Sequence, residues 1–230
     1  MAIAPRYFIT GTDTEVGKTV ATAQLLRALN QANIPAVGMK PVASGCVFQG
    51  DILVNEDVEL HRVASPIAAP PELSNPYRFV PPISPHLAAA EAGVNIDLAH
   101  LLACAEQLQT YAHTVLIEGA GGWFAPLSTQ ARIADLAVAL KAPVILVVGM
   151  RLGCINHALL SQAAIAASGL PLAGWIANRV DPNMQRYSDN LAYLQANIAA
   201  PLLAEIEHSP MAAQACLNPQ AIDRLKLHKL

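Results

Sequence analysis

The sequence predicts one α/β domain, in which a mostly parallel β-sheet is covered by helices on both faces. Three observations support this prediction. The chain has 230 residues, enough for one large core but few for two. Short apolar runs alternate with helical patterns along its length. The first apolar run leads into a glycine-rich loop and then a helix. We therefore expect residues 1–230 to form one domain, with the structure of the tail after about residue 207 left open.

The expected strands are short, nearly continuous apolar runs, which are typical of strands buried on both faces of a parallel sheet. They occupy residues 6–10, 34–39, 114–117, 144–148, 172–177 and 202–206, the last at a sheet edge. The strand at 144–148 (VILVV) is the most apolar of these. A glycine-rich turn is expected directly after the third strand, at residues 119–122.

The expected helices show apolar residues at the helical period. They occupy residues 18–32, 56–64, 86–92, 96–110, 132–140, 156–167 and 184–196. The second of these interrupts a proline-rich segment, residues 42–85, which is otherwise expected to be irregular. Irregular segments of this length usually carry function.

The loop after the first strand predicts a phosphate-binding site. It runs GTDTEVGKT from Gly11 to Thr19, one residue off the spacing G-x-x-x-x-G-K-[ST]. In such loops backbone N–H groups surround phosphate oxygens, the lysine (here Lys18) reaches the outer phosphates and the hydroxyl binds Mg²⁺. The following helix directs its N-terminus at the anion. The alternative is an ordinary turn with a solvated lysine, but the strand and helix around the motif favour a P-loop nucleoside triphosphate hydrolase fold.

Composition limits the classes of partner. A formal net charge of -3 offers no basic surface for nucleic acid. Hydrophobic residues make up 53% of the chain and charged residues 13%, which suggests either a membrane segment or a buried subunit contact. The longest uncharged stretch, residues 152–178, contains polar residues and a Ser-Gly-Leu-Pro break, so it predicts a helix and a strand. We therefore expect a buried subunit contact and no membrane partner, although richness in alanine alone could explain part of the apolar excess.

Two further features indicate the cellular setting. The first residues lack the charged start, long apolar run and cleavage site of a signal peptide, so we expect a cytoplasmic protein. The cysteines have no ligand spacing and are expected to be reduced thiols. The histidines also lack ligand spacing and are expected to be surface or core residues. They are His61, His86, His100, His113, His157, His208 and His228.

Two carboxylates are candidates to hold Mg²⁺ with the loop hydroxyl. Glu118 directly follows the apolar strand at 114–117, where a metal-binding carboxylate commonly lies in P-loop proteins. The alternative is a glutamate that caps the next turn. Asp57 lies at the start of the helix at 56–64, where it could also be a simple helix N-terminal acid.

After Lys18, Lys40 is the strongest candidate for a functional lysine. It follows the second strand, at the sheet edge where α/β proteins place ligands. A lysine there could stabilise charge on a transferring phosphoryl group or hold an anionic acceptor, or it could simply face solvent. Ser44 could donate a hydrogen bond to the same anion or could serve a turn. We expect both lysines at solvent-accessible positions, so that replacing either by alanine would abolish activity and leave the fold intact.

Several motifs, in this order, closely resemble the dethiobiotin synthetase family. They are GTDTEVGKT, GMKPVASG, NPYRF, PxSPH, VLIEGAGGW and LGCINH, and the resemblance extends over about residues 6–206. It implies a dimeric P-loop ligase of biotin biosynthesis that uses ATP and Mg²⁺. The implied reaction closes the ureido ring of dethiobiotin from 7,8-diaminononanoate and CO₂, through a carbamate and a carbamic-phosphoric anhydride, and releases ADP and phosphate.

The resemblance also implies roles for individual residues. Lys18, Lys40 and Thr14 would be catalytic, and Thr19, Asp57 and Glu118 would hold Mg²⁺. The nucleotide would be bound by Glu15, Val16, Gly17, Lys18, Thr19, Val20, Asp57, Glu118, Gly119, Ala120, Gly121, Asn178 and Arg179. The substrate would be bound by Thr14, Lys40 and Ser44, and its far carboxylate by a helix N-terminus of the partner subunit, which here is Leu152, Gly153, Cys154, Ile155 and Asn156.

Two departures from the family pattern concern the nucleotide base. Asn178 matches the family's base-reading asparagine, but Asn178-Arg179-Val180-Asp181 also resembles the guanine-reading pattern N-K-x-D. The preference between ATP and other nucleoside triphosphates therefore stays open. The family usually carries proline after Glu-Ile on the adenine side, where this chain has Glu207.

Two alternative functions use the same loop. A cobyrinic acid diamide synthase would need a glutamine-hydrolysing domain, for which 230 residues leave no room. A nucleotide-switched partitioning or membrane-associated ATPase would want a lysine early in the loop, where this chain has Asp13, and a basic amphipathic tail. Residues 222–230 resemble such a tail but are few for binding a membrane.

Overall fold

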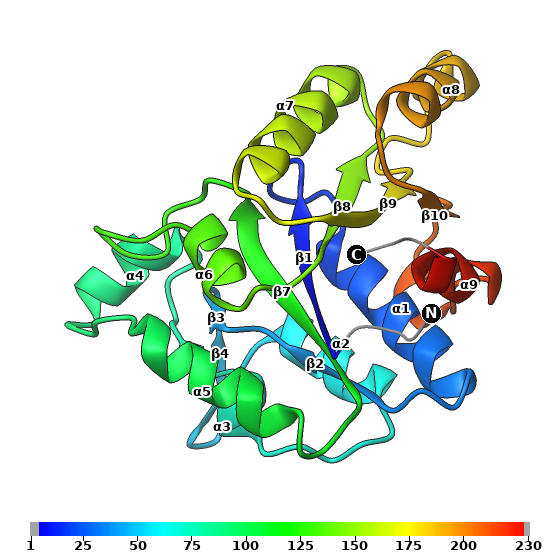
Figure 1. The fold of residues 1–230 in the computed structure, drawn as a ribbon. Helices are drawn as coiled ribbons and strands as arrows, with labels where there is room; N and C mark the ends of the chain where they lie inside the picture. Colours follow the sequence, from blue (N-terminus) through cyan, green and yellow to red (C-terminus); the bar gives the residue numbers. More distant parts are fainter. Residues whose placement is uncertain (1–4, 228–230) are drawn as a thin grey trace.

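The computed structural model describes residues 5–227 and is built around a six-stranded sheet (Figure 1). All neighbouring strands of this sheet are parallel, which confirms the predicted α/β fold. In spatial order the strands are β10 (Leu202–Ile206), β9 (Leu172–Asn178), β8 (Val144–Gly149), β1 (Arg6–Gly11), β7 (Thr114–Gly122) and β2 (Ala36–Met39). The predicted edge position of the last strand in the sequence, β10, is correct, and β2 forms the other edge.

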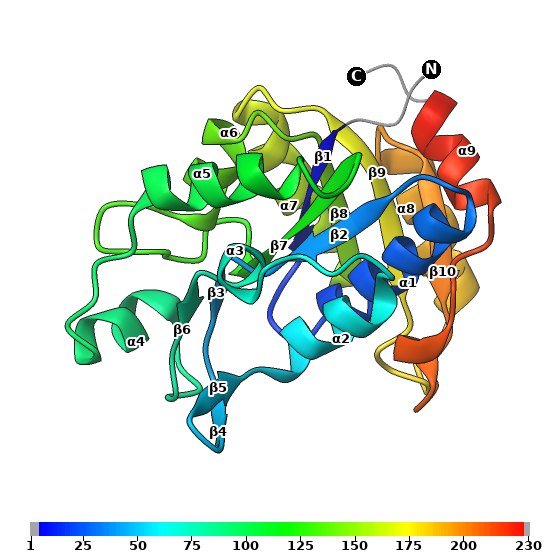
Figure 2. The same ribbon diagram turned by 90° about the horizontal axis from the view of Figure 1, so that it is seen from below.

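Side chains of the buried strands alternate between two cores, one on each face of the sheet. In β7, Val115 and Ile117 enter the first core and Leu116 enters the second. The first core is covered by α4 (Pro85–Glu91), α5 (Leu98–Leu108), α6 (Ile133–Ala139), α7 (Cys154–Ala167) and α8 (Tyr187–Asn197). The second is covered by α1 (Lys18–Gln31) and α9 (Gln220–Leu227). Figure 2 shows α1 and α5 on opposite sides of the strands.

The proline-rich segment contains more regular structure than the sequence indicates. Its helix, α2 (Glu56–Ala64), has the predicted bounds. The structure adds α3 (Pro71–Ser74), the parallel pair of β3 (Val42–Ala43) and β6 (Tyr77–Arg78), and a hairpin of β4 (Val47–Gln49) and β5 (Ile52–Val54). This hairpin projects from the body of the molecule (Figure 2). Strands of two or three residues are too short to show a periodicity, so the sequence could not indicate them.

The glycine run after Glu118 is part of a strand, so the predicted turn at residues 119–122 is wrong. Strand β7 continues to Gly122. A Cβ atom at Gly119 would lie 2.8 Å from the Ile133 side chain and 3.1 Å from that of Phe8. Glycine therefore lets the strand pass close beneath α6, which is a known use of glycine inside strands. In consequence, Glu118 lies within the strand.

The tail after residue 207 packs on the domain as far as it is described. Ala221, Ile222 and Leu225 of α9 are buried in the second core. Residues 1–4 and 228–230, which include the chain start and the last residues of the basic tail, lie outside the described residues. In the part of the chain that is described, no helix has the length and apolar character needed to cross a membrane.

Candidate functional site

The phosphate-binding loop connects β1 to α1 and is held from behind by Asn178. Gly17 precedes α1 in a left-handed conformation with φ of 80°, which favours glycine. The Asn178 amide at the end of β9 donates to the carbonyl of Val16 at 2.9 Å. A Cβ atom at Gly17 would lie 2.0 Å from the Asn178 Nδ2 atom. Asn178 therefore fixes the backbone of the loop, a contact that its predicted base-reading role did not include.

Lys18 begins α1 and folds back over the loop. Its Nζ atom donates to the Asp13 carbonyl at 3.1 Å, and only 7% of the residue is exposed. Burial lowers the pKa of Lys18 from 10.5 to about 8, although the charge of Glu118 opposes this shift. The alternative of a solvated lysine is therefore wrong, and so is the prediction that this lysine is solvent-accessible.

The register of the sheet brings Lys40 beside Glu118. Met39 of β2 pairs with Ile117 of β7, so the next residues on the two strands are neighbours. Lys40 Nζ donates to Glu118 Oε1 at 2.5 Å and to Asp57 Oδ2 at 2.8 Å. Thr19 Oγ1 donates to the same Glu118 oxygen at 2.9 Å. Four of the predicted site residues thus meet, each from a different part of the chain.

Lys40 and Glu118 stabilise each other's charge inside the protein. Lys40 is 6% exposed and Glu118 is 1% exposed, which excludes a solvent-facing Lys40 and a Glu118 that merely caps a turn. Burial favours the neutral form of both groups, but their interaction outweighs it. The Glu118 and Asp57 carboxylates hold the pKa of Lys40 above its usual range, against burial. Lys40 and His61 hold the pKa of Glu118 below its usual range, again against burial.

Asp57 reaches Lys40 because Asn55 starts α2. The Asn55 side chain accepts hydrogen bonds from the backbone N–H groups of Asp57 and Val58, which is the standard N-cap arrangement. The Asp57 carboxylate is therefore free of a capping role and pairs with Lys40. The Asn55 amide also donates to the Ser44 carbonyl at 3.2 Å, which ties α2 to the segment that carries Ser44.

His61 is a member of this network that the sequence reasoning missed. Its Nε2 atom lies 2.8 Å from Glu118 Oε2, and the residue is buried. The expectation of a surface or core histidine describes its burial but not this contact. One signal was present: Asp57 and His61 are four residues apart on α2, so both lie on one face of the helix.

Two adjoining cavities open beside the network. One of about 420 Å³ contains the charged side chains of the network, and the predicted residues that line it are Thr14, Glu15, Gly17, Lys18, Thr19, Val20, Lys40, Ser44, Asp57, Glu118, Ala120 and Gly121. A second cavity of about 530 Å³ shares Thr14, Ser44, Ala120 and Gly121 with it and extends between Pro82, Leu87 and Pro126. The second cavity is suited to an apolar chain. Thr14 and Ser44 therefore lie where the cavity with the charged side chains meets the second cavity.

Other predicted residues do not line these cavities. Val16 belongs to the loop but its side chain is buried, and Gly119 lies beneath α6. The Arg179 guanidinium lies 4.9 Å from the centre of the Tyr187 ring and 3.3 Å from Glu207 Oε2. The segment from Leu152 to Asn156 is outside both cavities of this subunit, and Leu152 is 93% exposed. The last three residues of this segment form the first turn of α7, which starts two residues before the predicted start.

The fold and the site define a P-loop protein of the nucleoside triphosphate-binding class. The family model described as an AAA domain matches residues 5–215. Among solved structures, the MinD cell division protein of Aquifex aeolicus is 14% identical, with a TM-score of 0.60 and coverage of 99% of this chain and 98% of that one. A ParA family ATPase from Chlorobium tepidum is also 14% identical, with a TM-score of 0.55 and coverage of 97% and 93%. Similarity at this level shows the fold alone.

Relatives with much higher sequence identity show which family of this class the chain belongs to. An ATP-dependent dethiobiotin synthetase of Xanthomonas axonopodis is 48% identical over 92% of this chain and 94% of its own. Those of Aromatoleum aromaticum and Salmonella typhi are 50% and 46% identical and cover 88% and 97% of this chain, and 90% and 98% of their own. The chain belongs to the dethiobiotin synthetase family. This confirms the resemblance in the motifs, and the partitioning ATPases are only distant structural relatives.

Proposed function

We propose that this protein closes the ureido ring of dethiobiotin from 7,8-diaminononanoate and CO₂, with conversion of ATP to ADP and phosphate. The main support for this proposal is that the chain belongs to the dethiobiotin synthetase family. The site supports it, because Lys18 and Lys40 line one cavity together with the phosphate-binding loop. In this reaction a carbamate must approach a γ-phosphate, and two cations reduce the repulsion between these anions.

The proposed steps use the two lysines in different ways. One amine of the diamine takes up CO₂ to form a carbamate, whose oxygen attacks the γ-phosphorus and releases ADP. The second amine then attacks the carbamic-phosphoric anhydride, closes the ring and expels phosphate. Lys18 would hold the outer phosphates, and Lys40 would stabilise the charge between carbamate and phosphoryl group. Thr14 would orient the reacting groups at the junction of the two cavities.

The shape of the site supports the proposed substrate. The alkyl chain would lie in the second cavity, beside Pro82 and Leu87, and Ser44 would hold the carbamate end. The far carboxylate would bind to the first turn of α7 of a partner subunit, where backbone N–H groups lack helical partners. The exposure of Leu152 beside this turn is compatible with such an interface.

The residues present fit a magnesium ion bound together with a nucleotide. Thr19, Asp57 and Glu118 supply hard oxygen donors, which Mg²⁺ prefers. Within residues 5–227 there is no cluster of three acidic, histidine or cysteine side chains that could hold a metal alone. Phosphate oxygens would therefore complete the coordination, as is usual for Mg²⁺. When bound, the ion would neutralise charge on the phosphates.

Isotope incorporation tests the proposed reaction. The purified protein would be incubated with 7,8-diaminononanoate, ATP, Mg²⁺ and ¹³C-bicarbonate, and the product analysed by mass spectrometry. We expect dethiobiotin that carries the label in its ureido carbonyl. Omission of the diamine or of ATP serves as the control. Failure to form labelled product with all components present would overturn the proposal.

The pKa of Lys18 predicts proton uptake when the nucleotide binds. In the free protein burial lowers the pKa of Lys18 to about 8, so near pH 8 about half of the molecules carry this proton. Bound phosphates favour the charged form and raise the pKa again. ATP binding near pH 8 should therefore take up roughly half a proton, and affinity should fall as the pH rises further. Calorimetry in buffers of different ionisation enthalpy measures this uptake.

A variant without the lysine provides the control for proton uptake. The Lys18→Met protein should show no uptake near pH 8 in excess of that at lower pH. Equal uptake in the two proteins would contradict the assignment of the proton to Lys18.

We also propose that the protein is one domain and a cytoplasmic homodimer without nucleic-acid or membrane partners. Sedimentation should show a dimer. Leu152→Glu should weaken the dimer and the binding of the diamine, because it puts a charge beside the proposed carboxylate site. Met211→Glu, which changes a similarly bulky residue that is 63% exposed, should leave both unchanged. A monomeric wild-type protein, or a dimeric and fully active Leu152→Glu variant, would contradict this interface.

A further inference from the structure

His61 contacts the back of the carboxylate that faces the nucleotide site. It projects from α2, is 3% exposed, and places Nε2 2.8 Å from Glu118 Oε2. The other carboxylate oxygen, Oε1, accepts hydrogen bonds from Lys40 and Thr19. The two oxygens of Glu118 therefore have separate partners: one faces the cavity of the proposed reaction, and the other faces α2.

In the hydrogen bond between His61 and Glu118, the histidine must be the donor. A charged carboxylate accepts hydrogen bonds and cannot donate them, so the ring must donate from Nε2–H. Such a bond to a charged group is short and strong compared with one between neutral groups. It restricts rotation of the carboxylate about its terminal torsion, which is otherwise broad.

The position of the ring is set by its close packing on Gly38. A Cβ atom at Gly38 would lie 2.8 Å from Cβ and Cγ of His61 and 2.9 Å from Nδ1. Real Cβ atoms do not approach other atoms this closely, so only glycine at this position accommodates the ring. Gly38 belongs to β2, the strand that also delivers Lys40. One strand therefore positions both the histidine and the lysine that hold Glu118.

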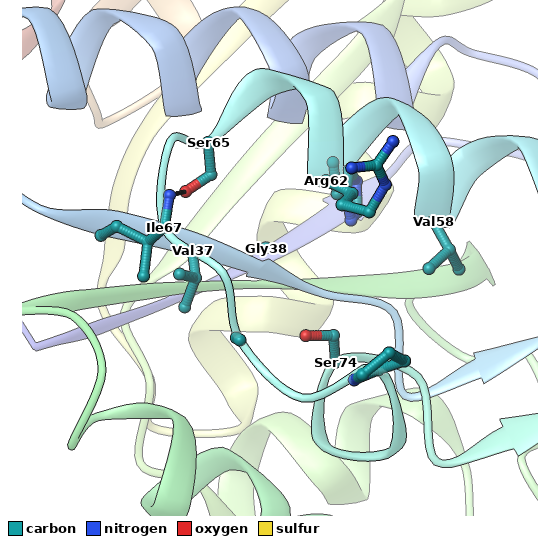
Figure 3. Close-up of a pocket in the computed structure, with 10 residues that line it drawn as sticks. Val37, Gly38, Val58, Arg62, Ser65, Ile67 and Ser74 are labelled. Carbon is teal, nitrogen blue, oxygen red and sulfur yellow. Dashed lines mark hydrogen bonds between the residues drawn. The ribbon is translucent and has the colours of Figure 1, made fainter.

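A small cavity lies beside His61, which forms part of its lining. Figure 3 shows it between β2, which contributes Val37 and Gly38, and α2, which contributes Val58 and Arg62. Its volume is about 60 Å³. This is less than half of the roughly 150 Å³ needed for a benzene-sized ligand, but several times the roughly 10–15 Å³ needed for water. Nδ1 has no partner among the described protein atoms, so this cavity suits water that donates to Nδ1.

We propose that His61 is a positioning residue, which holds Glu118 by Oε2 so that Oε1 points at the nucleotide and its magnesium ion. The inference rests on the proposed function, because it assigns Glu118 to that ion. Hydrogen-bonded supports behind a metal-binding carboxylate commonly contribute 10-fold to 100-fold to metal affinity or activity. His61 should act in the same way, without touching substrate or nucleotide.

Three substitutions test this role. His61→Leu removes the donor at similar volume, and His61→Gln offers an amide N–H in its place. Gly38→Ala keeps the histidine but displaces its ring. Val58→Ala is the matched control, because Val58 lines the same cavity and lies on the same helix, but its side chain has no group that could donate a hydrogen bond to Glu118. Thermal unfolding confirms that each variant is folded before it is compared.

Besides activity, the experiment measures how binding of a non-hydrolysable ATP analogue changes as the Mg²⁺ concentration increases. In His61→Leu and Gly38→Ala, the Mg²⁺ concentration that gives half of the maximal increase in analogue binding should rise at least about 10-fold. Binding of the analogue in the absence of Mg²⁺ should be unchanged. In turnover, kcat should fall more than the KM for the diamine rises. His61→Gln should recover to within about threefold of wild type, as Val58→Ala should.

The outcomes separate the inference from the proposed function. A wild-type protein that forms no dethiobiotin would refute the proposed function, whatever the variants do. An active wild type with an unchanged Mg²⁺ midpoint in His61→Leu would overturn the role of His61. A His61→Gln variant as impaired as His61→Leu would also overturn it, since a specific hydrogen bond would then not be the cause. If His61→Leu does not fold, Gly38→Ala provides the same comparison.

Discussion

Replacing Lys40 by alanine is expected to abolish ring closure and, in addition, to destabilise the fold. Removal of one donor that stabilises a transition state typically costs about 100-fold to 1,000-fold in rate. The variant also leaves Glu118, which is 1% exposed, without its closest cation. Breaking a buried ion pair from one side typically costs about 3–5 kcal/mol. Dethiobiotin formation and urea unfolding measure the two effects.

A second substitution separates the two effects of Lys40. In the double variant Lys40→Ala and Glu118→Gln, no unpaired carboxylate stays buried, so most of the lost stability should return while activity stays absent. His61 can still bond to the new amide oxygen. A single Lys40→Ala variant that is as stable as wild type, or that turns over at a comparable rate, would contradict the structure of this network.

Replacing Lys18 by methionine is expected to abolish activity without loss of stability. Burial lowers the pKa of Lys18 from 10.5 in the unfolded chain to about 8, so the folded state disfavours its charge. At neutral pH both states hold the proton, and the cost to folding is on the order of 3 kcal/mol. Methionine keeps the apolar stem and removes this cost. Without the cation on the outer phosphates, turnover should fall about 100-fold to 1,000-fold.

The pH dependence of stability also tests the claim that the buried charge of Lys18 destabilises the folded protein. A lysine with a lowered pKa in the folded state makes the protein more stable as the pH rises from about 8 to 10.5. Urea unfolding at several pH values should show this increase in wild type and a smaller one in Lys18→Met. A Lys18→Met variant that is several kcal/mol less stable than wild type near neutral pH would contradict the cost assigned to the buried charge.

The two lysines also illustrate where the sequence was sufficient and where it was not. Lys18 and Lys40 were identified because a motif and a strand end mark their positions. Their burial could not be predicted, since it depends on contacts with other parts of the chain: Lys18 bonds to the Asp13 carbonyl, and Lys40 bonds to Asp57 of α2. Loss of the lysine, which the sequence suggested would be harmless to the fold at both positions, is therefore expected to destabilise the protein at Lys40 but not at Lys18.

Other differences have similar causes. His61 shares a helix face with Asp57, but only the packing of α2 on Gly38 shows that its ring reaches Glu118. The glycines after Glu118 resemble a turn in sequence and prove to be strand residues, because their role is to let α6 approach. Long strands and helices have periodicities that survive in the fold. Contacts between elements leave no pattern in the local sequence. The site contacts that the sequence did not predict are of this kind.

Diamine-dependent phosphate release most directly tests whether this site closes a ureido ring. The assay would contain the protein, Mg²⁺, bicarbonate and, in separate reactions, ATP, GTP or CTP, each with and without 7,8-diaminononanoate. We expect rapid release with ATP only when the diamine is present, with one phosphate formed per dethiobiotin. The GTP and CTP reactions would show how strictly the Asn178 region selects the base. No diamine-dependent release with any of the three nucleotides would contradict the proposed reaction.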